Sequence, residues 1–135
     1  MLYGNYESIG NTNLSLNKSI VIHGDPDATF SCDGLGVFSM TSNISLILNS
    51  INFFNCGFVV KSEQNIQNFN LQVIGVHTKD CVEVISFVGS ELSVNVEKSK
   101  FENIGKSTIA VKSTSSQNPV TIHSSNFENC AKTAG

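Results

Sequence analysis

LILNSINF at residues 46–53 recurs as FNLQVIGV at 69–76, VNVEKSKF at 94–101 and VTIHSSNF at 120–127. In each copy the first, third and eighth positions are apolar, and the sixth is apolar or Ser. The copies begin 23, 25 and 26 residues apart. A period in this range is typical of a solenoid, in which each turn buries its apolar face by stacking on the next turn. The sequence therefore predicts an all-β chain that forms a parallel β-helix, or β-solenoid.

The composition agrees with short strands joined by many turns. The 135 residues include 16 Asn, 19 Ser and 10 Gly but no Arg, and 14% of them are charged. Asn, Ser and Gly accept the backbone dihedrals of tight turns. The net charge of −3 gives a polyanion nothing to bind, so nucleic acid is not an expected partner. No apolar run reaches the length of about 18 residues that spans a bilayer, so we expect no membrane insertion within this chain.

The regularity of the pattern divides the chain into two parts of one predicted β-helix segment, residues 1–135. Residues 1–45 read as irregular first coils, and residues 46–135 as regular coils of 23–26 residues, which gives about five coils. The sequence stops at FENCAKTAG, where the second strand of a coil should begin. We therefore expect a fragment of a longer solenoid whose C-terminal end is uncapped. Such an edge pairs with further coils of the same polypeptide or with another copy.

Stacking the four copies predicts columns of equivalent side chains. The eighth positions form an inward core stack of Phe53, Val76, Phe101 and Phe127. The residues two positions later form a structural ladder at a corner, made of Asn55, Thr78, Asn103 and Asn129. Amide side chains in such a ladder bond to one another along the stack.

Several stretches resemble a known family. SKFENIG at 99–105, SSNFENC at 124–130 and SINFFNC at 50–56 are similar to the Phe-x-Asn coils of pectin-lyase-like right-handed parallel β-helix proteins, especially surface proteins with polymorphic-outer-membrane-type repeats. NTNLSLNKSIVIHGDPDATFSC at 11–32 is similar to the first coils of such proteins. The resemblance implies a right-handed helix and an extracellular or cell-surface location. It is specific for the fold, because the superfamily includes lyases, hydrolases, esterases, adhesins and spacers. The Gly-Gly-Ala-Ile half of the repeat motif is absent from this chain.

The enzymatic members of that superfamily have signatures that this chain lacks. The resemblance would require an Arg near the reacting sugar for the lyases and methylesterases, and the chain has no Arg. The hydrolases place several Asp residues on adjacent coils, whereas the four Asp residues here are Asp25, Asp27, Asp33 and Asp80. We therefore predict no catalytic residue and no cofactor.

Two groups of residues are the remaining candidates for chemistry. His23, Asp25 and Asp27 lie in the stretch HGDPD, which offers an imidazole and two carboxylates to Ca²⁺ or to a proton, or forms an ordinary turn. Glu97 and His123 are predicted to be neighbours in one outward column. They form either a surface ion pair or a general acid/base couple.

The four cysteines have no two members within four residues of each other, so they do not indicate a metal site. Cys56 and Cys81 are 25 residues apart, about one coil. A disulfide between them along the stack is one interpretation, and buried free thiols are the other. Asn13, Asn17 and Asn43 begin Asn-x-Ser sequons, which are glycosylation acceptors if the chain is secreted.

The sequence thus leads to two hypotheses for function. The first is a non-catalytic β-helix scaffold of a secreted or cell-surface protein, with carbohydrate or another surface protein as its partner. The alternative is a portion of a pectin-lyase-like polysaccharide-degrading enzyme whose active-site coils lie outside this chain.

Overall fold

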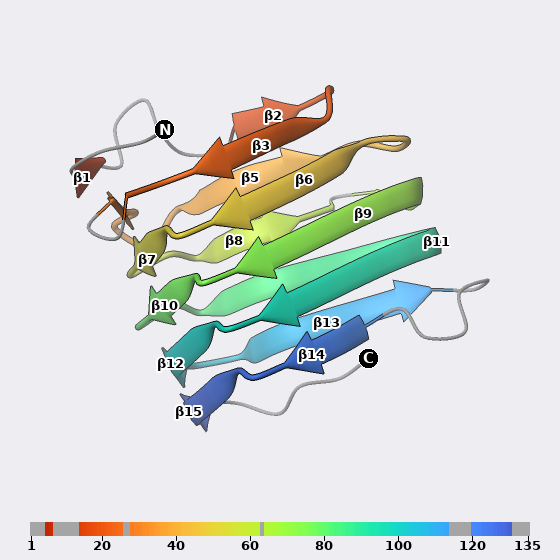
Figure 1. The fold of residues 1–135 in the computed structure, drawn as a ribbon. Coiled ribbons are helices and arrows are strands. Elements are labelled where there is room, and N and C mark those ends of the chain that lie inside the picture. The colour runs from red at the N-terminus through yellow and green to blue at the C-terminus, as the bar shows by residue number, and fades with distance from the viewer. Residues whose placement is uncertain (1–4, 7–13, 26–27, 63, 114–119, 131–135) are drawn as a thin grey trace.

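The computed structural model describes residues 5–6, 14–25, 28–62, 64–113 and 120–130, and the regular elements in these ranges are all β-strands (Figure 1). Six short strands form one sheet: β1 (Asn5–Tyr6), β4 (Thr29–Ser31), β7 (Asn52–Phe54), β10 (His77–Lys79), β12 (Lys100–Ile104) and β15 (Asn126–Cys130). Within the described residues, no helix has the length and apolar character needed to cross a membrane.

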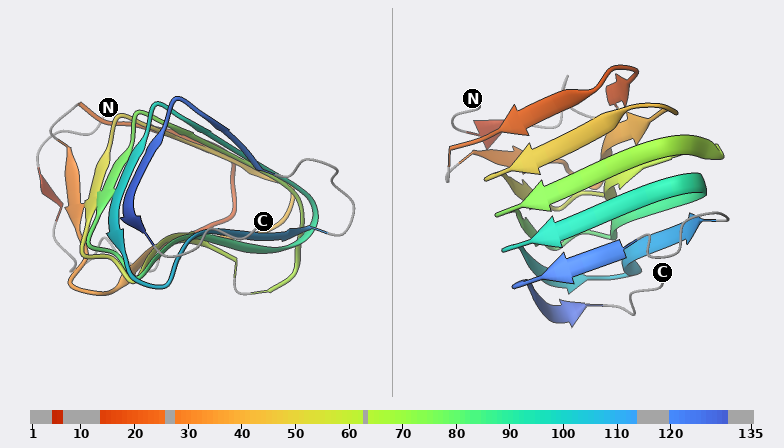
Figure 2. Two further views of the ribbon diagram at one scale, coloured as in Figure 1. Left: turned by 90° about the horizontal axis from the view of Figure 1, so that it is seen from below. Right: turned by 45° about the vertical axis from the view of Figure 1, so that its right-hand side comes forward.

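The other nine strands form a second sheet that folds around the molecule. They are β2 (Leu14–Leu16), β3 (Ile20–His23), β5 (Gly36–Met40), β6 (Ser45–Asn49), β8 (Phe58–Lys61), β9 (Ile66–Ile74), β11 (Glu83–Glu97), β13 (Ser107–Ser113) and β14 (Val120–His123). The first half of β11 pairs with β8 and β13, whereas its second half pairs with β9 and β14. This sheet therefore supplies two of the three sides of the coil seen end-on in Figure 2.

The strands pair in parallel on all three sides, and together they form a β-solenoid, as the sequence predicts. Four complete turns are present: β3–β4–β5, β6–β7–β8, β9–β10 with the first half of β11, and its second half with β12–β13. Strands β14 and β15 begin a further turn. The predicted count of about five coils is thus slightly too high, because the described residues before β3 contribute only β1 and β2, which pair with β4 and β5 and do not make a complete turn.

The core stack of the short-strand sheet differs from the predicted one at a single position. Phe53 pairs in register with Thr78, Thr78 with Phe101, and Phe101 with Phe127. Phe30 extends the stack, with its ring centroid 5.4 Å from that of Phe53. Thr78 therefore occupies the inward position that the sequence alignment assigned to Val76.

The cause of this error is a two-residue shift in the second copy of the repeat. Leu71, and not Phe69, pairs with Leu46, so the second copy begins two residues later than the sequence pattern suggests. Val76 is still buried, but it lies two residues before Thr78, just ahead of β10, where its N–H donates to Ser99 Oγ at 3.1 Å. A shift of two residues keeps inward side chains inward, so the apolar pattern does not detect it.

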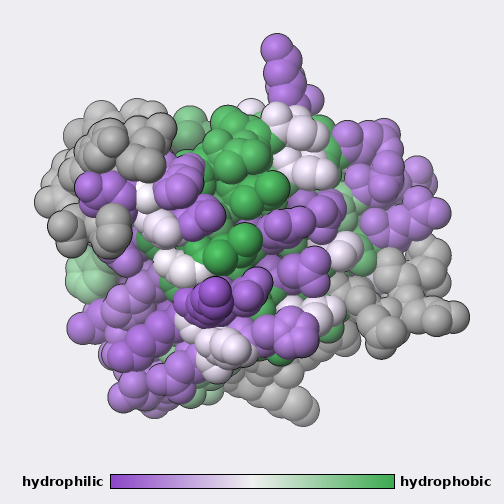
Figure 3. Space-filling model, viewed as in Figure 1, coloured by the Kyte–Doolittle hydropathy of each residue, from purple (hydrophilic) through white to green (hydrophobic). Residues whose placement is uncertain are grey.

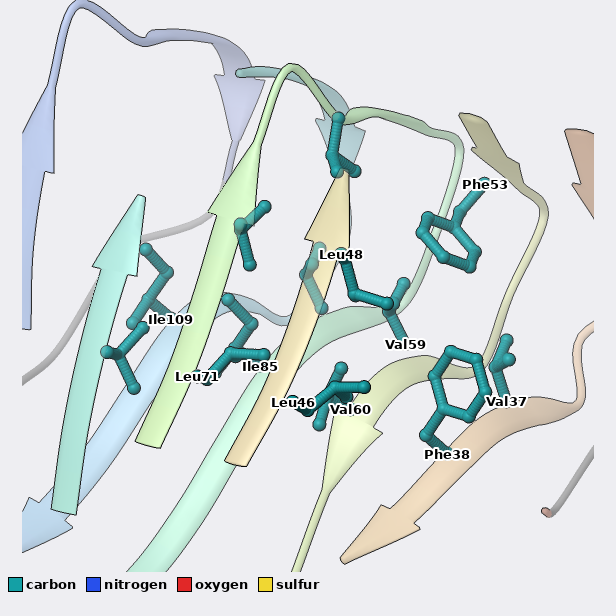
Figure 4. Close-up of a cluster of buried hydrophobic side chains, with 14 of the residues drawn as sticks. Val37, Phe38, Leu46, Leu48, Phe53, Val59, Val60, Leu71, Ile85 and Ile109 are labelled. Carbon is teal, nitrogen blue, oxygen red and sulfur yellow. The ribbon is translucent and has the colours of Figure 1, made fainter. Parts of the chain in front are cut away.

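The interior is a continuous apolar core that runs the length of the stack. Leu46 and Leu48 of β6 face Val59 and Val60 of β8 across the interior (Figure 4). Phe69 is also in this core, against the Phe87 ring at a centroid distance of 4.8 Å. Because each layer contacts the layers above and below it, the coils stabilise one another and no coil has a core of its own.

Two of the three corners are tight and share one backbone conformation in successive coils. The corner before the short strands has positive φ at Ser50, Gly75, Lys98 and Ser124. The corner after them has positive φ at Asn55, Asp80, Asn103 and Asn129, between 53° and 56°. Asn and Asp are the non-glycine residues that tolerate this left-handed conformation best.

The second of these corners carries the ladder, with one correction. Asn129 Nδ2 donates to Asn103 Oδ1 at 2.8 Å, and Asn103 Nδ2 donates to Asp80 Oδ1 at 2.9 Å. The ladder position of the second copy of the repeat is therefore Asp80, and the predicted member Thr78 lies in the core instead. The same two-residue shift explains both errors.

The third corner varies in length from coil to coil. Ser39, Lys61 and Ser86 are in register on the third side, and the next residues with positive φ are Asn43, Asn68 and Glu91. Four, seven and five positions separate these pairs, so the second coil bulges outward between Lys61 and Asn68. Gly89 of the next coil lies directly under the bulge. A Cβ at Gly89 would come within 1.8 Å of the Ile66 carbonyl oxygen, so only glycine fits there.

Candidate functional site

A pocket of about 290 Å³ lies beside the bulge of the third corner. Its described lining comes from β2, from β5 and the two residues after it, and from residues 64–66, where β9 begins. The lining residues are Ser15, Ser39, Met40, Thr41, Ser42, Gln64, Asn65 and Ile66. Ser15 and Ser39 are in register on neighbouring coils. The extra length of the second coil supplies the opposite wall, so this pocket depends on the irregularity of that corner.

The polar groups of this pocket are only partly used within the protein. Thr41 Oγ1 donates to the Leu16 carbonyl oxygen at 3.1 Å, and Ser42 Oγ accepts a hydrogen bond from the Gln67 N–H at 3.0 Å. The side chains of the other four polar residues form no hydrogen bond to another described residue; these are Ser15, Ser39, Gln64 and Asn65. The pocket therefore presents two free hydroxyls and two free carboxamides to solvent.

A charged cluster occupies the outer face of the short-strand sheet. The His77 imidazole contacts the Glu102 carboxylate on the next coil, and Lys100 Nζ lies 3.3 Å from Glu102 and 3.8 Å from Glu128. The hydrogen bond from His77, together with Lys100, lowers the pKa of Glu102. The two acidic groups thus share Lys100, whereas His77 contacts Glu102.

The first predicted group of candidate residues is placed only in part. His23 is exposed on β3, and the N–H of Ala28 donates to the Asp25 carbonyl oxygen at 2.9 Å, which closes a turn at this point. Asp27 lies outside the described residues. Among the residues that the structure describes, no group of three His, Cys, Asp or Glu side chains is arranged to hold a metal ion.

The second predicted group is brought together in register. Glu97 and His123 are paired neighbours on β11 and β14, and both are exposed. No ion pair joins these two side chains, and the only cation near Glu97 among the described residues is Lys98, with Nζ 4.0 Å from the carboxylate. The pair therefore lies on the exposed surface of this sheet.

The cysteines form a column at the corner after the short strands. Cys32 and Cys56 are joined by a disulfide between neighbouring coils, with their Cα atoms 4.7 Å apart. Cys81, on the following coil, is a buried free thiol, and its Sγ accepts a hydrogen bond from the Cys56 N–H at 3.2 Å. Cys130 is free as well. One interpretation of the sequence was a disulfide between Cys56 and Cys81, and this partner for Cys56 was wrong. The other interpretation was buried free thiols, and Cys81 is one.

The predicted glycosylation acceptors are placed in part. Asn17 and Asn43 are exposed near the first coils, and Asn13 lies outside the described residues.

Figure 3 shows that polar residues cover most of one side, with an apolar patch over β3 and β6. Val21 on β3, which is 63% exposed, and its register partner Ile47 belong to that patch.

Comparison with known proteins gives no relative. No protein-family profile matches the chain, and neither a curated protein nor a solved structure does. The resemblance to pectin-lyase-like proteins therefore stays a prediction, whereas the parallel β-solenoid itself is observed.

Sequence reasoning missed the pocket, the His77–Glu102 contact and the Cys32–Cys56 bond. The column of left-handed Asn and Asp residues contains a signal for the second of these, the His77–Glu102 contact. Aligning the coils on Asn55, Asp80 and Asn103 gives the observed register of the second copy of the repeat. That register moves His77 beside Lys100 and diagonal to Glu102.

Proposed function

We propose that this chain is a non-catalytic scaffold of a secreted or cell-surface protein and that it binds carbohydrate on its solvent-facing sides. The observation that carries the proposal is the Cys32–Cys56 disulfide between adjacent coils. Disulfides persist in oxidising compartments and are rare in the cytosol, where thiols are kept reduced. The resemblance to surface β-helix proteins agrees with this location.

The scaffold role is supported by the form of the molecule. A solenoid holds its outer side chains at fixed spacings of about 4.8 Å from coil to coil, because parallel strands define the separation. Among the exposed residues that the structure describes, Asn is the most frequent type, and its carboxamide both donates to and accepts from hydroxyl groups. The charged cluster around Glu102 is already neutralised by its neighbours, which favours a structural role for it.

The test of the location is the redox state of the protein taken from the cells that make it. Rapid acid quenching, alkylation and mass spectrometry should find Cys32 linked to Cys56 and Cys81 free. Protein with all four thiols reduced in its own compartment would overturn the proposed location.

The test of the non-catalytic role is turnover. The chain should bind a polysaccharide without cleaving it, with or without Ca²⁺. Cleavage of a polyuronide that disappears in His77→Asn or Glu102→Gln would instead support the alternative, a portion of a polysaccharide-degrading enzyme.

A further inference from the structure

We propose that the pocket of the third corner is a subsite for one uncharged sugar ring of a neutral glycan. This inference rests on the proposed carbohydrate-binding function and adds the place and the chemical class of the ligand. It follows from four properties of the pocket: the uncharged side chains of its described lining, its free polar groups, its apolar wall and its size.

The described lining disfavours acidic sugars as the preferred ligand. All eight described residues that line the pocket are uncharged, and Glu63, beside Gln64, lies outside the described residues. A uronate carboxylate would lose part of its hydration shell there without gaining a cation among the described lining residues. A neutral ring meets no such cost.

The free polar groups match hydroxyls in kind. Each carboxamide of Gln64 and Asn65 provides donors on nitrogen and an acceptor on oxygen, and the hydroxyls of Ser15 and Ser39 act in both roles. A sugar hydroxyl also both donates and accepts. None of the four side chains forms a hydrogen bond to another described residue, so binding breaks no hydrogen bond among them.

The apolar part of the lining gives the ring a surface to lie on. Met40 and Ile66 are 5% and 4% exposed, so they are held in place by the core while they contribute to the pocket wall. Methionine adapts to irregular apolar shapes because its side chain is unbranched and polarizable. The C–H face of a pyranose ring is the part of the ligand that fits this wall.

The size limits the ligand to a small unit. Small-molecule pockets range from about 300 to 1,000 Å³, and this pocket of about 290 Å³ lies at the lower end. The pocket on the other side of the bulge is smaller, about 190 Å³. A third, of about 420 Å³, is lined by Asn103 and Asn129, whose amides are bonded to each other in the ladder. The first pocket therefore combines suitable size with free polar groups.

The experiment uses the full chain with its disulfide intact and measures binding by ligand-observed NMR and calorimetry. The probes are the methyl glycosides of glucose, galactose and mannose, with glucuronic acid as an acidic counterpart of the same ring. We expect at least one neutral glycoside to bind with a Kd of about 1 mM or tighter, and glucuronic acid to bind more weakly.

Two variants locate the site, and a third is the matched control. Asn65→Ala and Ser39→Val should each weaken binding about threefold to tenfold, which corresponds to one lost neutral hydrogen bond. Asn95→Ala removes an exposed carboxamide from the second half of β11. Asn95 does not line the pocket, so this variant should leave the Kd unchanged. Thermal melts of all three variants establish that they are folded.

The outcomes separate this inference from the proposed function. Tighter binding of glucuronic acid, or binding that Asn65→Ala and Ser39→Val do not alter, would overturn the subsite while carbohydrate binding elsewhere on the scaffold stands. No binding of any neutral glycoside at tens of millimolar would also overturn it, and the redox test of the location would be unaffected.

Discussion

The tight corners and the third corner of this solenoid are built by opposite rules. At the corner after the short strands, each coil from the second onward has one left-handed Asn or Asp at the same register position, and the amides of the later coils bond along the stack. At the third corner the chain takes four, seven and five positions to cover the same path. The comparison teaches that the fixed corners set the register, whereas the variable corner can form a pocket without disturbing it.

The difference has a physical origin in the neighbouring core. The stack of Phe53, Thr78, Phe101 and Phe127 lies between the two tight corners, so an insertion there would move a buried ring. Close packing does not tolerate such a shift. At the third corner the extra residues Gln64 and Asn65 are exposed, and their length adds no strain to the core.

The first way to break this comparison is to remove a ring beside the tight corners. Phe101 is fully buried and stacks on Phe127 at a centroid distance of 4.9 Å. Phe101→Ala should lower the free energy of unfolding by about 3 to 5 kcal/mol, because it removes a buried aromatic and leaves a cavity. Asn95→Ala, on the outer surface, should change it by less than about 0.5 kcal/mol. Denaturant melts that gave equal effects would show that the register is wrong.

The second test compares the corners themselves. Asn103 has a φ of 54° and bonds to both of its ladder neighbours. Asn103→Ala should cost about 1 to 2 kcal/mol of unfolding free energy, and Asn103→Gly less, because glycine accepts this conformation without strain. Asn65→Ala at the third corner should cost less than about 0.5 kcal/mol. Chemical denaturation of the three variants checks the contrast, and an Asn65 effect as large as that of Asn103 would remove it.

The third test sharpens the corrected core stack. The Thr78 hydroxyl is buried and has no hydrogen-bond partner among the described residues. Thr78→Val keeps the shape of the side chain and removes the unpaired group, so it should raise the free energy of unfolding by about 1 kcal/mol. Thr108, also buried and unpaired, serves as a second case. A loss of stability in Thr78→Val would mean that the hydroxyl forms a hydrogen bond, and would contradict the unpaired inward position of this side chain.

The fourth test concerns the titration of the thiol beside the disulfide. This titration changes the stability of the protein only at alkaline pH. Burial raises the pKa of Cys81 from its ordinary value of 9.0 to about 11. The folded state therefore keeps this proton longer than the unfolded state does. Its contribution to stability is complete below pH 9 and is lost as the pH rises through about 11. Cys81→Ser should reduce the fall in melting temperature between pH 9 and 11. Rapid alkylation of Cys81 in the native protein at pH 8 would contradict its burial.

The strands were predictable from sequence because the apolar periodicity is repeated four times. The register of the second copy of the repeat was not predictable. Its apolar residues Phe69, Leu71, Val73 and Val76 are all buried and fit two alignments that differ by two residues. Both alignments place apolar residues inward, so hydrophobicity does not distinguish them. The left-handed position at Asp80 does distinguish them, because backbone conformation selects Asn, Asp or Gly there.

The pocket and the disulfide were beyond the sequence pattern for a different reason. The pocket depends on how far the bulge at Gln64 and Asn65 stands out from its neighbours, and apolar periodicity says nothing about an exposed corner. The Cys32–Cys56 bond depends on the register of the first coil, where the repeat is irregular. Each feature joins a regular coil to an irregular one. Predicting either of them therefore requires knowing first which residues of the two coils are neighbours along the stack.

The most direct measurement of the register is a methyl-to-aromatic NOE experiment on selectively labelled protein. The Thr78 methyl group should show NOEs to the rings of both Phe53 and Phe101, because the three residues are in register on adjacent coils. Val76 methyl groups should not contact both rings. NOEs from Val76 to both Phe53 and Phe101, with none from Thr78, would contradict the solenoid register on which the ladder and the outer charged cluster depend.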